Sequence, residues 1–265
     1  MTKPRILLLA DYPAGVQIVR FLVERGEDIV GCVVPPKSAE NIINKGAAAE
    51  ILAILKLPTE RVFSAEEITS EAGRAKIQAL APDIALSLYW GTILPPEFLA
   101  IPKETINLHL SYLPYNRGAN PNAWAIVEGT PAGVTLHTID AGADTGPIIA
   151  QKEVTKESID TGKSIYDKLS RTAVELFKEA WPSIVEGTAT RTPQSGPSTA
   201  HLRKDFQQLA AIDLDAPTTA RKVLDHLRAK TFPPFPGAYF IDADGREVQV
   251  RVELSYSDDH GEKSV

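Results

Sequence analysis

The polar residues between Asn107 and Gly146 have the types and the spacing that acyl transfer requires. Asn107 and His109 stand two positions apart in the apolar run Thr105–Leu110, so in an extended strand both side chains lie on one face. A hydrogen-bond donor beside a proton acceptor suits the attack of an amine on a carbonyl, because an oxyanion forms and a proton must leave the nitrogen. Asp144 lies in a later loop that, folded back, would hold the imidazole. We therefore predict that Asn107, His109 and Asp144 are catalytic.

These assignments have structural alternatives. A lone histidine in an apolar strand is more often packed than functional, but the polar residues around His109 favour a role in chemistry. Asp140 and Asp144 flank Gly142, and aspartates in such positions also serve as turn formers. His137 lies in the middle of a strand and lacks the polar surroundings of His109, which is typical of a surface or packed histidine.

The segment that follows His109 is a turn crowded with polar side chains. Its sequence over residues 111–122 is S-Y-L-P-Y-N-R-G-A-N-P-N. Polar groups of this kind cost several kcal/mol when they are buried without partners. We therefore expect the turn to face a ligand.

Length and composition limit the class of protein. A chain of 265 residues that is 43% hydrophobic has room for one full domain and a small second lobe. The net charge of −6 argues against a large nucleic-acid footprint, which needs clustered Lys and Arg. Neither a signal peptide nor an apolar stretch long enough to cross a membrane is apparent, so we predict a cytoplasmic protein that engages no membrane.

The single cysteine, Cys32, excludes an intramolecular disulfide and any site with several thiolate ligands. It lies in an apolar run, where free cysteines usually fill space, so we expect a core residue. There is no H-E-x-x-H motif and no close cluster of His and Cys, and we predict no metal.

Apolar runs and helical patterns alternate along the first two thirds of the chain. Short continuous runs indicate buried strands, and strand–helix–strand within about 30 residues is typical of a parallel sheet. Expected strands are 5–10, 29–34, 61–63, 84–88, 105–110, a half-exposed 132–140, and 146–154. Expected helices are 15–25, 47–55, 70–80, and 165–185 with an interruption near Pro182. The prediction is a doubly wound, Rossmann-like α/β domain with a parallel sheet.

Composition changes after Glu186, where residues 187–199 are rich in Thr, Ser, Pro and Gly and read as a linker. Beyond it we expect a helix over 217–230, a hairpin whose turn is D-A-D-G-R at 242–246, and a frayed tail from Tyr256. We predict a catalytic domain over residues 1–190 and a small helix-plus-β-hairpin lobe over 200–265.

The start of the chain does not carry a dinucleotide fingerprint. The sequence A-D-Y-P-A-G places Pro13 and Ala14 where glycines would let the backbone approach a pyrophosphate. A phosphate-binding G-x-x-x-x-G-K-[ST] motif is also absent.

Three segments of the sequence resemble the folate-dependent formyltransferase family. They are N-L-H-L-S-Y-L-P-Y-N-R-G from residue 107, W-A-I-V-E-G-T-P-A-G-V-T-L from residue 124, and D-A-G-A-D-T-G-P-I-I-A-Q from residue 140. The resemblance covers roughly residues 5–190 and extends loosely into R-A-K-T-F-P-P-F-P-G-A-Y-F. One departure is Leu110, where many relatives have proline. The resemblance implies N10-formyltetrahydrofolate as formyl donor and a catalytic trio that matches Asn107, His109 and Asp144.

The resemblance also implies that the donor binds in the loop that follows the fourth parallel strand. From their chemistry we expect the acceptor in the turn after His109 and just past the linker, since these segments supply amides, a phenol and positive charge. The donor residues are Tyr89, Trp90, Gly91, Thr92, Ile93, Leu94 and Asp140. The acceptor residues are Ser111, Tyr115, Asn116, Arg117, Gly118, Asn120, Asn122, Arg203 and Lys204. Four of them have structural alternatives: Trp90 as a core residue, Arg117 as a brace of the turn, and Arg203 with Lys204 as a solvated pair.

Within the family, L-P-Y-N-R-G-A-N-P-N looks most similar to enzymes that formylate amino sugars carried on a nucleotide. The methionyl-tRNA enzymes usually read R-G-A-A-P and carry a larger, often basic C-terminal domain. The resemblance thus implies a nucleotide-sugar substrate, no nucleic-acid partner, a homodimer as one assembly, and a place in lipopolysaccharide or O-antigen biosynthesis. Three alternatives stay open: methionyl-tRNA formylation, hydrolysis of formyltetrahydrofolate, and a non-catalytic folate-binding protein.

Overall fold

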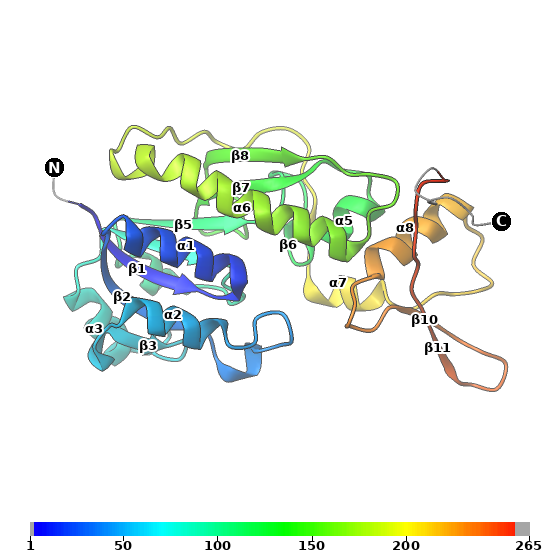
Figure 1. Ribbon diagram of the computed structural model, residues 1–265, viewed down its shortest axis with the longest axis horizontal. Helices are drawn as coiled ribbons and strands as arrows, with labels where there is room; N and C mark the ends of the chain where they lie inside the picture. The colour runs from blue at the N-terminus through cyan, green and yellow to red at the C-terminus, as the bar shows by residue number, and fades with distance from the viewer. Residues whose placement is uncertain (1–2, 258–265) are drawn as a thin grey trace, which may run out of the picture. The chain divides into compact units, whose positions relative to one another are not determined.

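A seven-stranded sheet dominates the computed structural model, which describes residues 3–257 (Figure 1). Its strand order is β3-β2-β1-β4-β5-β7-β8. The strands are β1 (Arg5–Ala10), β2 (Asp28–Val34), β3 (Val62–Ser64), β4 (Ile84–Leu88), β5 (Glu104–His109), β7 (Ala132–Thr138) and β8 (Ile148–Val154). The order reverses direction between β1 and β4, which is where open α/β sheets bind ligands at the carboxyl ends of their strands.

The doubly wound α/β fold predicted from the sequence is confirmed, with one correction to the sheet. Strands β1 to β5 pair in parallel, but β7 runs antiparallel to β5, so the sheet is mixed. The prediction of a half-exposed strand over residues 132–140 was wrong, because Ala132–His137 is buried. The polar alternation in G-V-T-L-H-T places polar side chains inside the protein, opposite polar residues of β5.

Helices cover both faces of the sheet. They are α1 (Tyr12–Glu24), α2 (Ala47–Leu55), α3 (Glu71–Ala79), α4 (Pro96–Leu99) and α6 (Gly162–Val185). On one face Phe21 of α1 lies edge-on to Phe177 of α6 at 6.4 Å between ring centroids. Short 3-10 turns, η1 (Lys37–Ala39) and η2 (Thr59–Arg61), complete this part of the chain.

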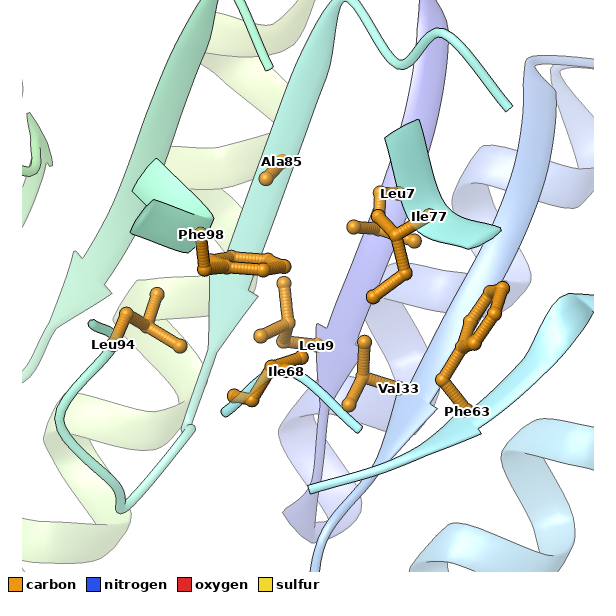
Figure 2. Packing of buried hydrophobic residues seen from close by; sticks show 9 residues of the cluster. All are labelled: Leu7, Leu9, Val33, Phe63, Ile68, Ile77, Ala85, Leu94 and Phe98. Atoms are coloured by element: carbon orange, nitrogen blue, oxygen red, sulfur yellow. The ribbon is translucent and has the colours of Figure 1, made fainter. Parts of the chain in front are cut away.

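The opposite face of the sheet carries an apolar cluster, which Figure 2 shows on one side of the strands. Strand β1 contributes Leu7 and Leu9, α3 contributes Ile77 and α4 contributes Phe98. All four side chains are fully buried. Because β1 also buries Ile6 and Leu8 on its other face, its continuous apolar run is explained by cover on both sides.

Helix α6 is continuous, so the interruption predicted near Pro182 was wrong. The helix also begins at Gly162, earlier than the expected residue 165. Proline removes one backbone donor, but it falls near the end of this helix, and the Glu186 N–H donates to the Pro182 carbonyl at 3.1 Å. The last turn therefore forms despite the proline.

The chain divides into two compact units. One holds the chain as far as His109 together with Val134–Lys152 and Ser170–Ser195. The other holds Leu110–Gly133, Glu153–Leu169 and the chain from Gly196 onward. The second unit contains β6 (Arg117–Gly118), α5 (Pro121–Val127), β9 (Ala200–His201), α7 (Arg203–Gln208), α8 (Ala220–Lys230), β10 (Ala238–Ile241) and β11 (Glu247–Val250).

The predicted hairpin is confirmed, because β10 and β11 pair antiparallel on either side of residues 242–246. Helix α8 begins at Ala220 rather than at 217, with Thr219 capping the Lys222 N–H. Helix α7 was not predicted. The frayed tail expected from Tyr256 lies largely outside the described residues. In the part of the chain that the structure describes, none of the helices combines the length and apolarity needed to cross a membrane.

We expect Cys32 to resist alkylation while the protein is folded. Its side chain is 1% exposed, and burial raises the pKa of the thiol to about 12. At pH 8 the thiolate fraction is therefore on the order of one in ten thousand, and the sulfur is also shielded. Iodoacetamide labelling followed by mass spectrometry tests this in native protein and in denaturant. Rapid labelling of the native protein would contradict the core assignment.

Candidate active site

Strands β5 and β7 place four polar side chains next to one another. Asn107 and His109 alternate with apolar residues along β5, so both leave the same face. In the antiparallel register, Asn107 lies opposite His137 and His109 lies opposite Thr135. The amide and one imidazole of β5 therefore lie beside a second imidazole and a hydroxyl of β7.

The predicted trio comes together around the Asp144 carboxylate. Its Oδ1 lies 3.4 Å from Asn107 Nδ2, and its Oδ2 lies 3.7 Å from His109 Nε2. The Asp144 side chain is 17% exposed and the His109 side chain 12% exposed. The Asp144 carboxylate thus lies within reach of both the Asn107 amide and the His109 imidazole, in a partly water-excluded setting.

His137 belongs to the same group, although its sequence context indicated a packed histidine. It is 1% exposed, and its Nε2 lies 3.1 Å from Asn107 Nδ2 and 3.5 Å from Asp144 Oδ1. Its Nδ1 lies 2.8 Å from the Thr138 carbonyl, which only accepts hydrogen bonds. Nδ1 therefore carries a proton, and in the tautomer protonated there Nε2 accepts from the Asn107 amide. This contact fixes the orientation of the Asn107 side chain.

The loop that carries Asp144 is shaped by tight backbone contacts. Asp144 has φ 53°, in the left-handed region that aspartate tolerates better than most residues. A Cβ at Gly146 would lie 1.8 Å from the Thr138 carbonyl oxygen, so only glycine fits there. The Asp140 carboxylate accepts hydrogen bonds from the Gly142 N–H and the Thr145 hydroxyl. Asp140, predicted to bind the donor, thus stabilises the loop.

Gln194 also holds this loop, a role that the sequence analysis did not predict. Its Nε2 donates to the carbonyls of Asp144 and Gly146, each at 2.8 Å. The strand-like bridge between Ile148 and Thr192 brings Gln194 into reach. No sequence pattern predicts such a bond for a glutamine in a segment rich in Pro and Thr.

The predicted donor loop follows β4, at the point where the strand order reverses. Tyr89 begins it with φ 62°, and the next exposed residues are Gly91, Thr92 and Ile93, the last 91% exposed. Leu94 turns inward and is 7% exposed. Trp90 is half-buried and packs against the apolar cluster of the sheet. Gly91, Thr92 and Ile93 are therefore the exposed part of the loop, and Tyr89 is half-buried beside them.

The turn after β5 lies in the second unit, and two of its amides serve the fold. Asn116 is 1% exposed and bonds to the hydroxyls of Thr130 and Thr199. Asn122, 8% exposed, donates to the Gly162 carbonyl at 2.8 Å.

The other predicted acceptor residues of the turn differ in exposure. Arg117 and Gly118 form β6 and pair with β9. Ser111 is buried, whereas Tyr115 and Asn120 are partly exposed. The described side chains open to a ligand are thus Tyr115, Arg117 and Asn120.

Arg203 and Lys204 open helix α7, directly after β9. Both side chains are exposed, and the Asp205 carboxylate accepts the Leu202 N–H at 2.7 Å, which fixes the start of the helix. Within residues 3–257, no group of three His, Cys, Asp or Glu side chains is arranged to hold a metal ion.

Two family models match the chain. The model described as formyl transferase matches residues 8–181. The model described as the N-formyltransferase dimerization C-terminal domain matches residues 205–256.

Individual relatives point to two acceptor classes. A dTDP-4-amino-4,6-dideoxyglucose formyltransferase of Mycobacterium tuberculosis is 42% identical over 149 residues, which are 56% of this chain and 64% of that relative. The chain thus spans less than two thirds of the length of this relative. A methionyl-tRNA formyltransferase of Thermodesulfovibrio yellowstonii is 33% identical over 91% of this chain and 77% of its own length.

Solved structures share the fold. A 4-N formyltransferase from Francisella tularensis superposes with a TM-score of 0.82 and 26% identity, over 96% of this chain and 98% of that chain. A formyltransferase from Anoxybacillus kamchatkensis was solved with UDP-4,6-dideoxy-4-formamido-L-AltNAc and tetrahydrofolate. It matches with a TM-score of 0.55 and 31% identity over 85% of this chain and 98% of that chain.

Proposed function

Because the chain belongs to the formyl transferase family, we propose that it transfers a formyl group from N10-formyltetrahydrofolate to the amine of a nucleotide-linked amino sugar. The observation that carries this proposal is the convergence of Asn107 and His109 on the Asp144 carboxylate, at 3.4 and 3.7 Å. An acceptor for a proton and a donor for an oxyanion then lie side by side, as amide formation from an amine requires.

In the proposed reaction the sugar amine attacks the formyl carbon, and the electron pair of the carbonyl moves onto oxygen. His109 accepts the proton that the nitrogen loses. It then delivers a proton to N10 of the folate as the carbon–N10 bond breaks, leaving a formamide and tetrahydrofolate. Asp144 stabilises the imidazolium between these two transfers.

To stabilise the oxyanion, Asn107 must give up one of the hydrogen bonds that its amide makes in the protein. Its two N–H groups donate to His137 Nε2 at 3.1 Å and to Asp144 Oδ1 at 3.4 Å. The second contact is longer and therefore weaker, so this hydrogen is the one that turns to the developing negative charge. The exposed Gly91–Ile93 and the half-buried Tyr89 ring beside them suit a flat, hydrogen-bonding heterocycle, and we assign the donor to them.

Three observations favour an amino sugar over methionyl-tRNA as acceptor. The net charge of −6 provides little attraction for a polyanion. The relative that is 42% identical acts, by its name, on a dTDP-linked amino sugar. The structure from A. kamchatkensis contains a UDP-linked formamido sugar beside tetrahydrofolate. This acceptor class fits a role in making lipopolysaccharide or O-antigen sugars in the cytoplasm.

The proposal extends to organisation and assembly. We assign catalysis to residues 1–190 and place a small lobe at 200–265, close to the ranges that the two family models match. The match to a dimerization domain supports a homodimer. Leu214, Leu224 and Ile241 of the lobe are about half exposed or more, as expected for residues that a second copy covers.

The test is formation of an N-formyl sugar from defined substrates. Purified protein is incubated with N10-formyltetrahydrofolate and dTDP-4-amino-4,6-dideoxyglucose, and the products are identified by mass spectrometry. We expect a formylated sugar and stoichiometric tetrahydrofolate. Release of formate at the same rate without sugar would instead support the hydrolase, and formylation of methionyl-tRNA alone would support the tRNA enzyme.

Replacing both Arg203 and Lys204 with alanine is expected to raise KM for the nucleotide sugar about tenfold and to leave KM for the folate unchanged. The reason is that an anionic diphosphate needs positive charge, and this exposed pair provides it. The matched control is Arg221→Ala/Lys222→Ala, an exposed pair of the same type on α8. The assignment would be contradicted if KM for the nucleotide sugar rose equally in both double variants, or if it rose in neither.

A further inference from the structure

A buried polar pair near the carboxyl end of β1 is not used by the chemistry described above. Asp11 and Asn44 are each 4% exposed, and Asn44 Nδ2 donates to Asp11 Oδ2 at 2.6 Å. Burial raises the pKa of the Asp11 carboxyl, while the bonds from Asn44 and from the Tyr12 N–H act in the opposite direction. Such a pair is costly to bury unless its hydrogen bonds are satisfied within the protein.

The pair ties the loop after β2 to the start of α1. Asn44 also donates to the Ala39 carbonyl at 3.2 Å and accepts from the Asn41 N–H at 2.6 Å. Asn41 Nδ2 in turn donates to the Tyr12 hydroxyl at 3.2 Å. The Asp11 carboxylate accepts the Tyr12 N–H at 2.8 Å. Two independent bonds, one to the backbone and one to the hydroxyl, therefore fix Tyr12.

Tyr12 lies against the first residue of the predicted donor loop. Its ring centroid is 5.8 Å from that of Tyr89, and the Asp11 N–H donates to the Leu88 carbonyl at 3.1 Å. Both tyrosines have φ 62°, in the left-handed region. Non-glycine residues persist there only where their surroundings over-determine the backbone, and they cluster at ligand sites. The two residues also flank the point between β1 and β4 where the strand order reverses.

We infer that Tyr12 is a positioning residue for the folate donor: locked by Asp11, Asn41 and Asn44, its ring holds Tyr89 in the conformation that binds the donor. The inference deepens the proposed function and rests on it. Tyr12 acts through Tyr89 rather than on the reacting atoms. Its loss should therefore weaken donor binding and leave acceptor binding unchanged.

The experiment measures the Kd of 5-formyltetrahydrofolate, the stable donor analogue, by titration calorimetry, and KM for each substrate. We expect Tyr12→Ala and Asn44→Ala to weaken folate binding about tenfold. Tyr12→Phe, which keeps the ring but loses the bond from Asn41, should weaken folate binding less than Tyr12→Ala does. KM for the nucleotide sugar should not change in any of them.

Arg20→Ala is the matched control. Arg20 likewise ties α1 to the chain that follows β2, through an ion pair with Glu50 of α2 at 3.0 Å, but it does so on the exposed surface. It should bind folate as wild type does. If Tyr12→Ala does not fold, Tyr12→Leu replaces it. The inference is overturned, and the proposed function is not, if the Tyr12 variant and Asn44→Ala both bind folate within twofold of wild type. Failure of wild type to bind any reduced folate overturns the proposed function as well.

Discussion

His109→Ala is expected to lower kcat by about 10²–10⁴-fold, the usual contribution of a positioned acid–base group. The protein should stay folded, since the side chain is 12% exposed and lies at the edge of the core rather than inside it. KM for both substrates should change little, because the imidazole acts in the transition state. Steady-state kinetics with circular dichroism of the variant provides the measurement.

The matched control for this variant is His226→Gln. The His226 imidazole bonds to the Leu209 carbonyl in the second unit, and glutamine retains a donor for that bond. This control should turn over at the wild-type rate. Turnover of His109→Ala within threefold of wild type would remove His109 from the mechanism. Asn107→Ala should also lose orders of magnitude, since it removes the oxyanion donor.

Gly146→Ala is expected to abolish most activity by displacing the loop that carries Asp144. The added Cβ would meet the Thr138 carbonyl oxygen at 1.8 Å and its carbonyl carbon at 2.7 Å, and these backbone atoms cannot rotate away as the end of a side chain can. We expect kcat to fall by about 100-fold, because misplacement by about 1 Å has that effect. The free energy of unfolding, measured by thermal unfolding, should fall by about 1–3 kcal/mol.

Gly15→Ala serves as the comparison, since a Cβ there would lie 3.7 Å from its nearest neighbour, in ordinary contact. It lies inside α1, where alanine is the better helix former, and should retain activity and stability. Wild-type activity in Gly146→Ala would show that the Asp144 loop tolerates displacement. Asp144 would then have no positional role in catalysis.

Much of the site geometry followed from strand periodicity. Positions two apart share a face of any strand, so Asn107 and His109 were expected together before the sheet was known. The runs of β1 and β2 were recognised as buried because their apolar residues are continuous rather than alternating with polar ones. Local signals of this kind need no knowledge of neighbours.

The remaining contacts depend on neighbours that no local pattern reveals. His137 looked like a packed histidine because its partner Asn107 is 30 residues away and the antiparallel register alone sets them opposite. Gln194 reaches the Asp144 loop only because the chain returns beside Ile148. Asn116 and Asn122, expected to face substrate, satisfy groups of their own unit instead. Whether a polar residue serves the fold or a ligand is decided by tertiary pairing.

The division of the chain separates two structural requirements. The polypeptide leaves the unit of the Asn107–His109–Asp144 group after His109 and re-enters it at Val134, having formed part of the other unit in between. The register of β5 and β7 must stay fixed, because a shift of one residue would turn His137 to the opposite face. The segment between them has to satisfy the other unit instead, in which Asn116 and Asn122 form their bonds. A substitution in that segment therefore acts first on the second unit, and the strand register that sets Asn107 opposite His137 does not depend on it.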